Sequence, residues 1–494
     1  MNMALYKKDL LVYNTLKGVK ERFVPVREDR VGMYVCGPTV YGEAHLGHAR
    51  SAITFDIVYR VLKYLGYNVR YVRNFTDVGH LVADSDDGDD KVEKKAQAEN
   101  KEPQEVAQYY EMMYLRATDA LNCLRPNIMP IASGHIMEQI EVVKILMDKG
   151  LAYESEGSVY FDVEKYNDTV KKYGILSHRT LEDTLENSRE LSGQQEKRNP
   201  FDFALWKKAP KEHIMKWDSP WSLGFPGWHL ECTAMGRKYL GAEFDIHGGG
   251  MDLIFPHHDC EIAQSVGAFG DMPAKYWLHN NMITIEGKKM GKSYNNFITL
   301  TEMFNGSHPL LKQAYNPMTI RFFMLMAHYR STLDFSNDAL IAAEKGLARL
   351  MEAKAKVGTL KESKESSFDV HKIINDALDA VCDDFNTPIM IAHLFELCKH
   401  INSVADNKET ITKEDKEFLQ TSLDAIVEDI LGLKDEKGGN DTQVIDGLMS
   451  LVMDMRAEAR SNKDYATSDK IRDALKELGI EIKDSKDGAT WRLM

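Results

Sequence analysis

The chain has 494 residues, of which 43% are hydrophobic and 28% charged, and its formal net charge is −14. This length is sufficient to bury a sizeable core and predicts about three domains, while the acidic balance argues against broad, nonspecific binding of nucleic acids. The sequence also predicts a cytoplasmic protein that does not enter membranes, because it has no secretory signal, no run of roughly 20 apolar residues and no C-x-x-C pair among its six cysteines.

The first predicted unit is a βαβ crossover. Residues 31–36 form an apolar, β-rich run, residues 52–65 carry apolar side chains at helical spacing before Gly66, and residues 68–73 again read as a strand. Two strands joined in this way belong to a parallel sheet, which binds ligands at the carboxyl ends of its strands. The sequence therefore predicts an α/β fold with a Rossmann-type parallel sheet.

The turn after the first strand carries Pro38 and the sequence His45-Leu-Gly47-His48. The two histidines share one face of the first helical turn, beside backbone N–H groups that attract phosphate, and Gly47 allows a nucleotide to approach closely. Two histidines near a helix start are more often ordinary surface residues. The position of this pair between a strand and a helix favours a nucleotide site.

Residues 123–220 are predicted to be an insertion between the two halves of this sheet, with a helix over residues 134–149 and a strand over residues 159–163. The sheet resumes with a strand over residues 243–247.

Three glycines and Asp252 follow that strand. Glycines directly after a strand, Gly249 among them, predict close approach to a ligand, and Asp252 can accept hydrogen bonds from a ribose. A plain turn explains the glycines equally well.

A candidate metal-binding pair is formed by His257 and Glu261. Their i, i+4 spacing places both side chains on one side of a helix that begins near Pro256. An isolated pair of this kind is more often a surface hydrogen bond, and Cys260 is a rival ligand on chemical grounds. Spacing alone leaves these alternatives open.

A glycine-flanked loop, Gly287-Lys-Lys289-Met-Gly-Lys292-Ser293, follows the second half of the sheet. Its lysine ammonium groups can meet a leaving pyrophosphate. Taken alone, such a loop is a common surface feature.

From Asn337 onward, helical periodicity replaces the strand signals and predicts a helical domain over residues 337–433, in which Thr387 caps a helix ahead of Pro388. A terminal module over residues 435–494 begins with an amphipathic helix. The basic residues Arg456, Arg460 and Lys463 lie on one face of this helix, as either a phosphate-binding stripe or a solvated face, while Leu448, Val452 and Met455 can pack on the other side.

The chain resembles the class I aminoacyl-tRNA synthetases in its ordered pair of signatures, usually written H-I-G-H and K-M-S-K-S; here Leu46 replaces the isoleucine and Gly291 the middle serine. Further segments resemble the cysteinyl-tRNA synthetase family over the whole chain, namely residues 34–41, 227–232 and 244–258 and the terminal Gly-x-x-Trp-Arg. In two places the chain departs from that family. Asp259-Cys260 replaces its usual Glu-Asn, and residues 74–80 lack its paired aspartates.

The resemblance implies a cysteine–tRNA ligase, expected to be a monomer, that acts on ATP, L-cysteine and tRNA(Cys). It implies a catalytic domain over residues 1–336, a tRNA-binding helical domain and an anticodon-binding terminal module. It also implies one zinc ion, joined by the thiolate of the substrate cysteine, and Mg²⁺ bound with ATP. The zinc ligands would be Cys36, Cys232, His257 and Glu261. The catalytic residues would be His45, His48, Lys289 and Lys292. The ATP-binding residues would be Pro38, His45, Gly47, His48, Gly249, Asp252 and Lys292, and the cysteine pocket would contain Thr76 and Trp228.

Three other functions share features with this sequence. A cysteine ligase that acts on an amino sugar uses the same adenylate but lacks the carboxyl-terminal region. A tRNA-binding paralogue without catalysis is supported only by Gly291 in the lysine loop. A nucleotidyltransferase that shares the His-x-Gly-His turn would be short and would not need the metal ligands.

Overall fold

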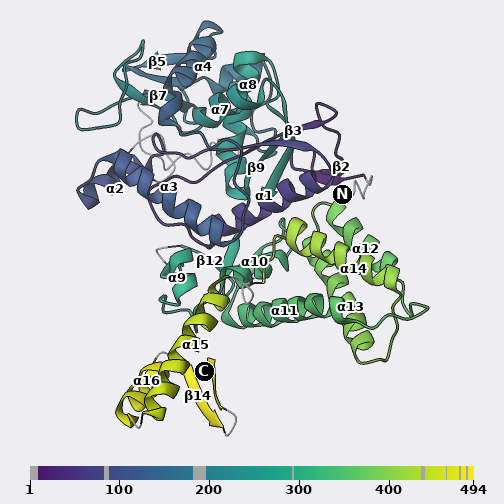
Figure 1. Cartoon of the computed structure of the whole chain (residues 1–494). Helices are drawn as coiled ribbons and strands as arrows, with labels where there is room; N and C mark the ends of the chain where they lie inside the picture. Colours follow the sequence, from purple (N-terminus) through teal and green to yellow (C-terminus); the bar gives the residue numbers. More distant parts are fainter. Residues whose placement is uncertain are drawn as a thin grey trace. The chain divides into compact units, whose positions relative to one another are not determined.

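The computed structural model describes residues 9–82, 88–181, 196–291, 294–435, 440–462, 464–477, 480–485 and 488–493. The chain divides into two compact units, residues 1–433 and 434–494 (Figure 1). In the described part of the chain, no helix is long and apolar enough to span a bilayer.

The first unit is organised around a parallel sheet. Its strands lie in the order β10 (Ala274–Asn280), β9 (Phe244–Gly250), β3 (Arg30–Val35) and β4 (Asn68–Arg73). Helix α1 (Leu46–Tyr64) joins β3 to β4, which confirms the predicted crossover and the α/β fold class. The chain runs from β3 to β4 on one side and later enters β9 on the other. The switch point, where such sheets bind ligands, therefore lies between β3 and β9.

The two faces of this sheet belong to different hydrophobic cores. Val31, Met33 and Val35 of β3 pack into the core that contains the apolar side of α1, whereas Tyr34 and Cys36 pack into a second core with α7 (Leu230–Leu240) and α8 (Asp259–Phe269). This alternation follows from the two-residue period of a strand. It directs Cys36 toward α7 and α8.

A second, antiparallel sheet is formed by residues that lie between β4 and β9 in the sequence. Its strands lie in the order β5 (Ala152–Ser155), β6 (Ser158–Phe161), β7 (Phe203–Lys208) and β8 (Gly224–Pro226). The strand predicted over residues 159–163 ends earlier, because Asp162 caps α5 (Val163–Thr169) and accepts a hydrogen bond from the Lys165 N–H. The helices before this sheet are α2 (Lys91–Glu99), α3 (Pro103–Ala120), η2 (Ser133–His135) and α4 (Ile136–Asp148).

The glycine run at the end of β9 does not form a plain turn, one of the two alternatives that the sequence left open. The strand continues through Gly250 and is followed by the short helices η4 (Met251–Leu253) and η5 (Ile254–His258). A Cβ atom at Gly248 would lie 2.2 Å from the ring of Phe55 in α1. Gly248 therefore allows a core aromatic ring to pack on the strand.

The remaining elements of the first unit are two small sheets and a group of helices. The strands are β1 (Leu11–Asn14), β2 (Val19–Arg22), β11 (Ile283–Ile285), β12 (Lys288–Lys289) and β13 (Leu333–Phe335). The helices are α9 (Leu300–Asn305), α10 (Pro317–Leu325), α11 (Asn337–Lys356), η7 (Val357–Thr359), α12 (Val370–Cys382), α13 (Thr387–Ala405), α14 (Lys413–Asp424) and η8 (Ala425–Ile430). The predicted cap of α13 is wrong by one residue. Asn386 accepts the Ile389 N–H, while the Thr387 hydroxyl donates to the Leu325 carbonyl at 2.7 Å.

The second unit consists of α15 (Asn440–Ser461), α16 (Tyr465–Glu477) and an antiparallel hairpin of β14 (Ile480–Ser485) and β15 (Gly488–Leu493). The predicted faces of its first helix are wrong. Arg456 is buried, with 4% of its surface exposed, whereas Leu448 and Met455 are more than half exposed. Lys463 lies outside the described residues. A helical wheel gives the relative angles of these side chains but not the face that tertiary contacts bury.

Candidate active site

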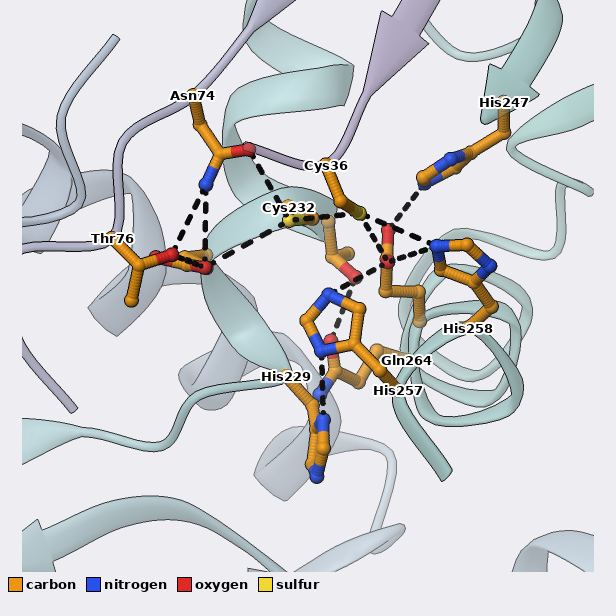
Figure 2. Close-up of polar contacts among 12 residues, drawn as sticks. Cys36, Asn74, Thr76, His229, Cys232, His247, His257, His258 and Gln264 are labelled. Atoms are coloured by element: carbon orange, nitrogen blue, oxygen red, sulfur yellow. Dashed lines mark hydrogen bonds and ion pairs between the residues drawn. The ribbon is translucent and has the colours of Figure 1, made fainter. Parts of the chain in front are cut away.

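Four candidate metal ligands converge beyond the carboxyl end of β3 (Figure 2). Cys36 follows β3, Cys232 lies in the first turns of α7, and His257 and Glu261 lie where η5 leads into α8. Their ligand atoms all lie within 4.8 Å of one another, and the four residues are buried. The structure thus brings together the whole ligand set that the resemblance implied, although 196 residues separate the two cysteines.

The spacing of these atoms fits a tetrahedral zinc ion. Metal–sulfur bonds of about 2.3 Å place two sulfur ligands about 3.8 Å apart, and bonds of about 2.1 Å to nitrogen and oxygen place those atoms about 3.4 Å apart. The sulfur atoms of Cys36 and Cys232 are 3.7 Å apart, and His257 Nε2 lies 3.2 Å from Glu261 Oε1. Two thiols, an imidazole and a carboxylate are also a donor set that zinc accepts.

The cluster favours charged forms of three of its groups. Burial disfavours the Cys36 thiolate, but the Cys232 hydrogen bond and the His257 charge lower the pKa of Cys36 to about 6. Burial and the interaction with Cys36 raise the pKa of Cys232 well above its usual value. Burial opposes the charged form of Glu261 as well, yet His247 and His257 lower its pKa to about 2. For His257, burial is outweighed by Cys36 and Glu261, which raise its pKa to about 10.

Histidines that the sequence analysis did not single out surround the ligands. His229 Nδ1 lies 3.0 Å from His257 Nδ1, and His247 Nε2 lies 2.8 Å from Glu261 Oε2. Such contacts orient metal ligands. The only sequence signal was their proximity to the predicted ligands, in the stretches Trp228-His229 and Phe244-Asp-Ile-His247, and spacing alone did not separate them from ordinary core residues.

His258 supplies an alternative to the predicted ligand set. Its Nε2 atom lies 3.3 Å from Cys36 Sγ, and the ligand atoms of Cys36, His247, His258 and Glu261 also lie within 4.8 Å of one another. Cys260, the rival ligand, belongs to neither group among the described residues, and its sulfur lies 3.3 Å from the Tyr173 hydroxyl.

Trp228 borders the cluster. Its ring stacks on His80, with centroids 3.8 Å apart and planes at 10°, and lies 4.7 Å from the ring of His257. His80 is held at both ring nitrogens, by the Thr39 hydroxyl at 2.6 Å and the Lys91 ammonium at 2.6 Å. This chain of contacts fixes the plane of the indole beside a ligand residue.

Thr76 also lies beside the cluster, at the end of a buried polar chain (Figure 2). Its hydroxyl donates to Glu231 Oε1 at 2.5 Å, and the Asn74 amide donates to the same carboxylate at 3.3 Å. Asn74 Oδ1 lies 3.9 Å from Cys232 Sγ. Burial, only partly offset by the Thr76 hydrogen bond, raises the pKa of Glu231 to about 8. A cation bound beside this carboxyl group would lower the pKa again and restore the carboxylate.

The two signature histidines lie at the start of α1. His45 caps the helix, and its Nδ1 accepts the Gly47 N–H, while His48 Nδ1 accepts the His45 N–H. Burial and the nearby His45 and Arg73 lower the pKa of His48 well below its usual value. His48 is therefore neutral with its proton on Nε2, a hydrogen-bond donor. The rings stack 3.8 Å apart, and a Cβ atom at Gly47 would collide with the His45 ring at 2.9 Å.

The lysine loop lies against the same helix start. Within the loop, the Met290 methyl group lies 3.7 Å from the position of a Cβ atom at Gly47, and beyond it the Leu300 N–H at the start of α9 donates to the Ala44 carbonyl. Asn296 holds the loop by accepting the Gly291 N–H and donating to the Lys289 carbonyl. The Lys289 side chain is exposed. Lys292 and Ser293 lie outside the described residues.

The other predicted ATP-binding residues lie at the same edge of the sheet. The Pro38 carbonyl accepts the Thr76 N–H beyond the ends of β3 and β4, Gly249 is buried near the end of β9, and Asp252 is exposed just after it.

The parallel sheet, the histidine turn at its switch point and the adjoining lysine loop define a class I aminoacyl-tRNA synthetase catalytic domain. A family model described as "tRNA synthetases class I (C) catalytic domain" matches residues 22–345. The solved structure of Mycobacterium tuberculosis methionyl-tRNA synthetase in complex with methionyl-adenylate shares this fold, with a TM-score of 0.56 and 14% identity over 81% of this chain and 89% of that one.

Further comparisons specify the family. A DALR domain model matches residues 368–434, and a model of the cysteinyl-tRNA ligase anticodon binding domain matches residues 452–492. The cysteine–tRNA ligase of Porphyromonas gingivalis is 59% identical, over 98% of this chain and 99% of that protein, and that of Parabacteroides distasonis is 61% identical with the same coverage. The chain belongs to the cysteine–tRNA ligase family.

Proposed function

We propose that this chain activates L-cysteine with ATP and transfers it from the adenylate to the 3′-terminal adenosine of tRNA(Cys). Its family makes it an ATP-dependent aminoacyl-tRNA ligase. The observation that supports cysteine as the amino-acid substrate is the buried cluster of two thiols, an imidazole and a carboxylate near the nucleotide turn. The match to an anticodon-binding domain favours this function over the amino-sugar ligase and the short nucleotidyltransferase.

In this proposal Cys36, Cys232, His257 and Glu261 hold zinc. When bound, zinc supplies a soft Lewis acid that prefers a thiolate to a hydroxyl group. An apolar pocket separates near-isosteres by only about 10²-fold, which is too little to exclude serine. A metal that prefers sulfur therefore removes the need for a separate editing site. Thr76 and Trp228 line the pocket for the rest of the amino acid.

The nucleotide groups act mainly by position and charge, because adenylate formation requires little covalent chemistry from the protein. His45 and His48 present Nε2–H donors at the start of α1, and Lys289 and Lys292 neutralise the departing pyrophosphate together with Mg²⁺. Pro38, Gly47, Gly249 and Asp252 complete the ATP site.

We assign the catalytic domain to residues 1–336, with an inserted subdomain over about residues 123–220, the helical tRNA-binding domain to residues 337–433 and the anticodon-binding module to residues 435–494. The family models at residues 22–345, 368–434 and 452–492 support this division. We further propose a monomer that works in the cytoplasm.

ATP–pyrophosphate exchange tests this function, with cysteine and serine as parallel substrates and a Cys232→Ala variant beside the wild type. We expect exchange with cysteine alone and its loss, together with the zinc, in the variant. Absence of exchange from folded, zinc-loaded wild type would overturn the enzymatic function and favour the non-catalytic tRNA-binding paralogue.

A further inference from the structure

A buried carboxylate in the amino-acid pocket, Glu231, belongs to neither candidate metal-ligand group. Only 2% of its surface is exposed. Its Oε1 atom accepts the Thr76 and Asn74 hydrogen bonds, whereas its Oε2 atom is buried and has no hydrogen-bond partner among the described residues. A buried carboxylate oxygen without a donor carries a desolvation cost that a bound ligand can remove.

The groups around this oxygen are arranged as acceptors. The Thr76 hydroxyl donates its proton to Glu231 and accepts from the Asn74 amide at 3.3 Å, so it can offer a ligand only its remaining lone pair. No ion pair joins Glu231 to a lysine or arginine in the described parts of the chain. A carboxylate oxygen and a hydroxyl that can only accept, in a site without a lysine or arginine partner, match a cationic group with several N–H donors.

The distance from the cluster specifies which cation fits. Glu231 Oε1 lies 3.9 Å from Cys232 Sγ, one of the candidate zinc ligands. In cysteine, only two carbon atoms separate the thiol sulfur from the amino nitrogen. A cysteine whose sulfur reaches the cluster therefore carries its ammonium group to within a few ångströms of Glu231.

We propose that Glu231, together with the Thr76 hydroxyl that it orients, binds the α-ammonium group of the amino-acid substrate. This inference rests on the proposed cysteine site. Glu231 and the metal cluster then act as two fixed points that recognise the nitrogen and the sulfur of one small molecule. Homocysteine, which has one additional methylene group, cannot place both atoms equally well.

The test compares two thiol ligands that differ in the ammonium group, L-cysteine and 3-mercaptopropionate. Their binding to the zinc-loaded full chain is measured by calorimetry under reducing conditions, with the zinc content of each sample determined. In Glu231→Gln we expect cysteine to bind about 10²-fold more weakly, because a buried charge pair is lost, and 3-mercaptopropionate to bind within about threefold of wild type. The zinc content stays unchanged.

Two further variants guard against a folding defect. Thr76→Val removes only the hydroxyl and should weaken cysteine binding by about tenfold without affecting 3-mercaptopropionate. Asp245→Asn is the matched control, because Asp245 is a buried carboxylate of β9 that accepts the Val26 and Gly32 N–H groups. It should leave the ratio of the two affinities unchanged.

The proposal is overturned if Glu231→Gln weakens both ligands equally with loss of zinc, which would make Glu231 a support of the metal site, or if it changes neither affinity. If the wild type binds both thiols but gives no pyrophosphate exchange, only the proposed catalytic function is overturned. The effect of Glu231→Gln on cysteine and on 3-mercaptopropionate can still be compared in that case. Wild type that binds neither thiol would overturn both.

Discussion

The metal-ligand cluster and the nucleotide turn lie at the same edge of one sheet but are built from different parts of the chain. At the cluster, buried side chains from the residue after β3, from α7 and from the η5–α8 junction meet, and neighbouring histidines contact two of them. At the nucleotide turn, the proposed recognition groups are the backbone start of α1, two half-buried histidines and an exposed lysine.

This difference indicates how each half of the site should respond to substitution. Removing a buried ligand leaves the other charged groups of the cluster uncompensated, so we expect single changes there to act on the whole cluster. At the turn, the proposed donors would each stabilise the transition state separately, so we expect graded losses.

At the nucleotide turn, the largest effect is expected at His48. Because His48 Nδ1 accepts a backbone N–H, its Nε2–H is the group that faces a ligand. His48→Ala should lower the rate constant of pyrophosphate exchange by about 10²- to 10³-fold, the usual cost of one lost donor to developing charge. The KM for cysteine should stay near the wild-type value.

His48→Gln is the matched control, because its side-chain amide can reproduce the donor near the position of Nε2; it should recover part of the rate. A large rise in the KM for cysteine in His48→Ala would contradict the separation of the two halves of the site.

The fold of the nucleotide half was predictable because its signals are local. Helical spacing and a glycine stop define α1, and the strand patterns on either side define the crossover. The cluster is different: the helix rule paired His257 with Glu261, but no spacing rule connects Cys36 with Cys232, and only the resemblance to a family did so. Glu231 was missed altogether, because its importance depends on burial and on an oxygen without a donor.

The surroundings of Gly248 likewise depend on a contact that the local sequence does not reveal, and they provide the second prediction. The sequence left Gly248 either near a ligand or in a plain turn, whereas in the structure the Phe55 ring packs where a side chain at this position would lie. Gly248→Ala should reduce the free energy of unfolding by about 1–3 kcal/mol through overpacking, measured by denaturant titration.

Gly250→Ala in the same strand is the control for this change. Its Cβ atom would meet only the carboxylate end of the exposed Asp252 side chain, so the free energy of unfolding should change by less than about 0.5 kcal/mol. Equal losses in the two variants would contradict the role assigned to Phe55, and Phe55→Leu should relieve part of the cost of Gly248→Ala.

The smallest effect concerns pH and Asp90, at the start of α2. Asp90 is buried, caps α2 and accepts the Gly79 N–H, and burial outweighs its backbone hydrogen bonds to raise its pKa to about 6. Its pKa in the unfolded chain is about 3.9, so between these values the folded state binds more protons. The contribution of Asp90 to stability therefore falls as pH rises through this window, by about 1.4 kcal/mol between pH 5 and pH 7.5.

Asp90→Asn keeps an acceptor for the cap but does not titrate. The difference in unfolding free energy, wild type minus variant, should be larger at pH 5 than at pH 7.5, and a difference that grows in the opposite direction would show that the hydrogen bonds outweigh burial at this carboxylate.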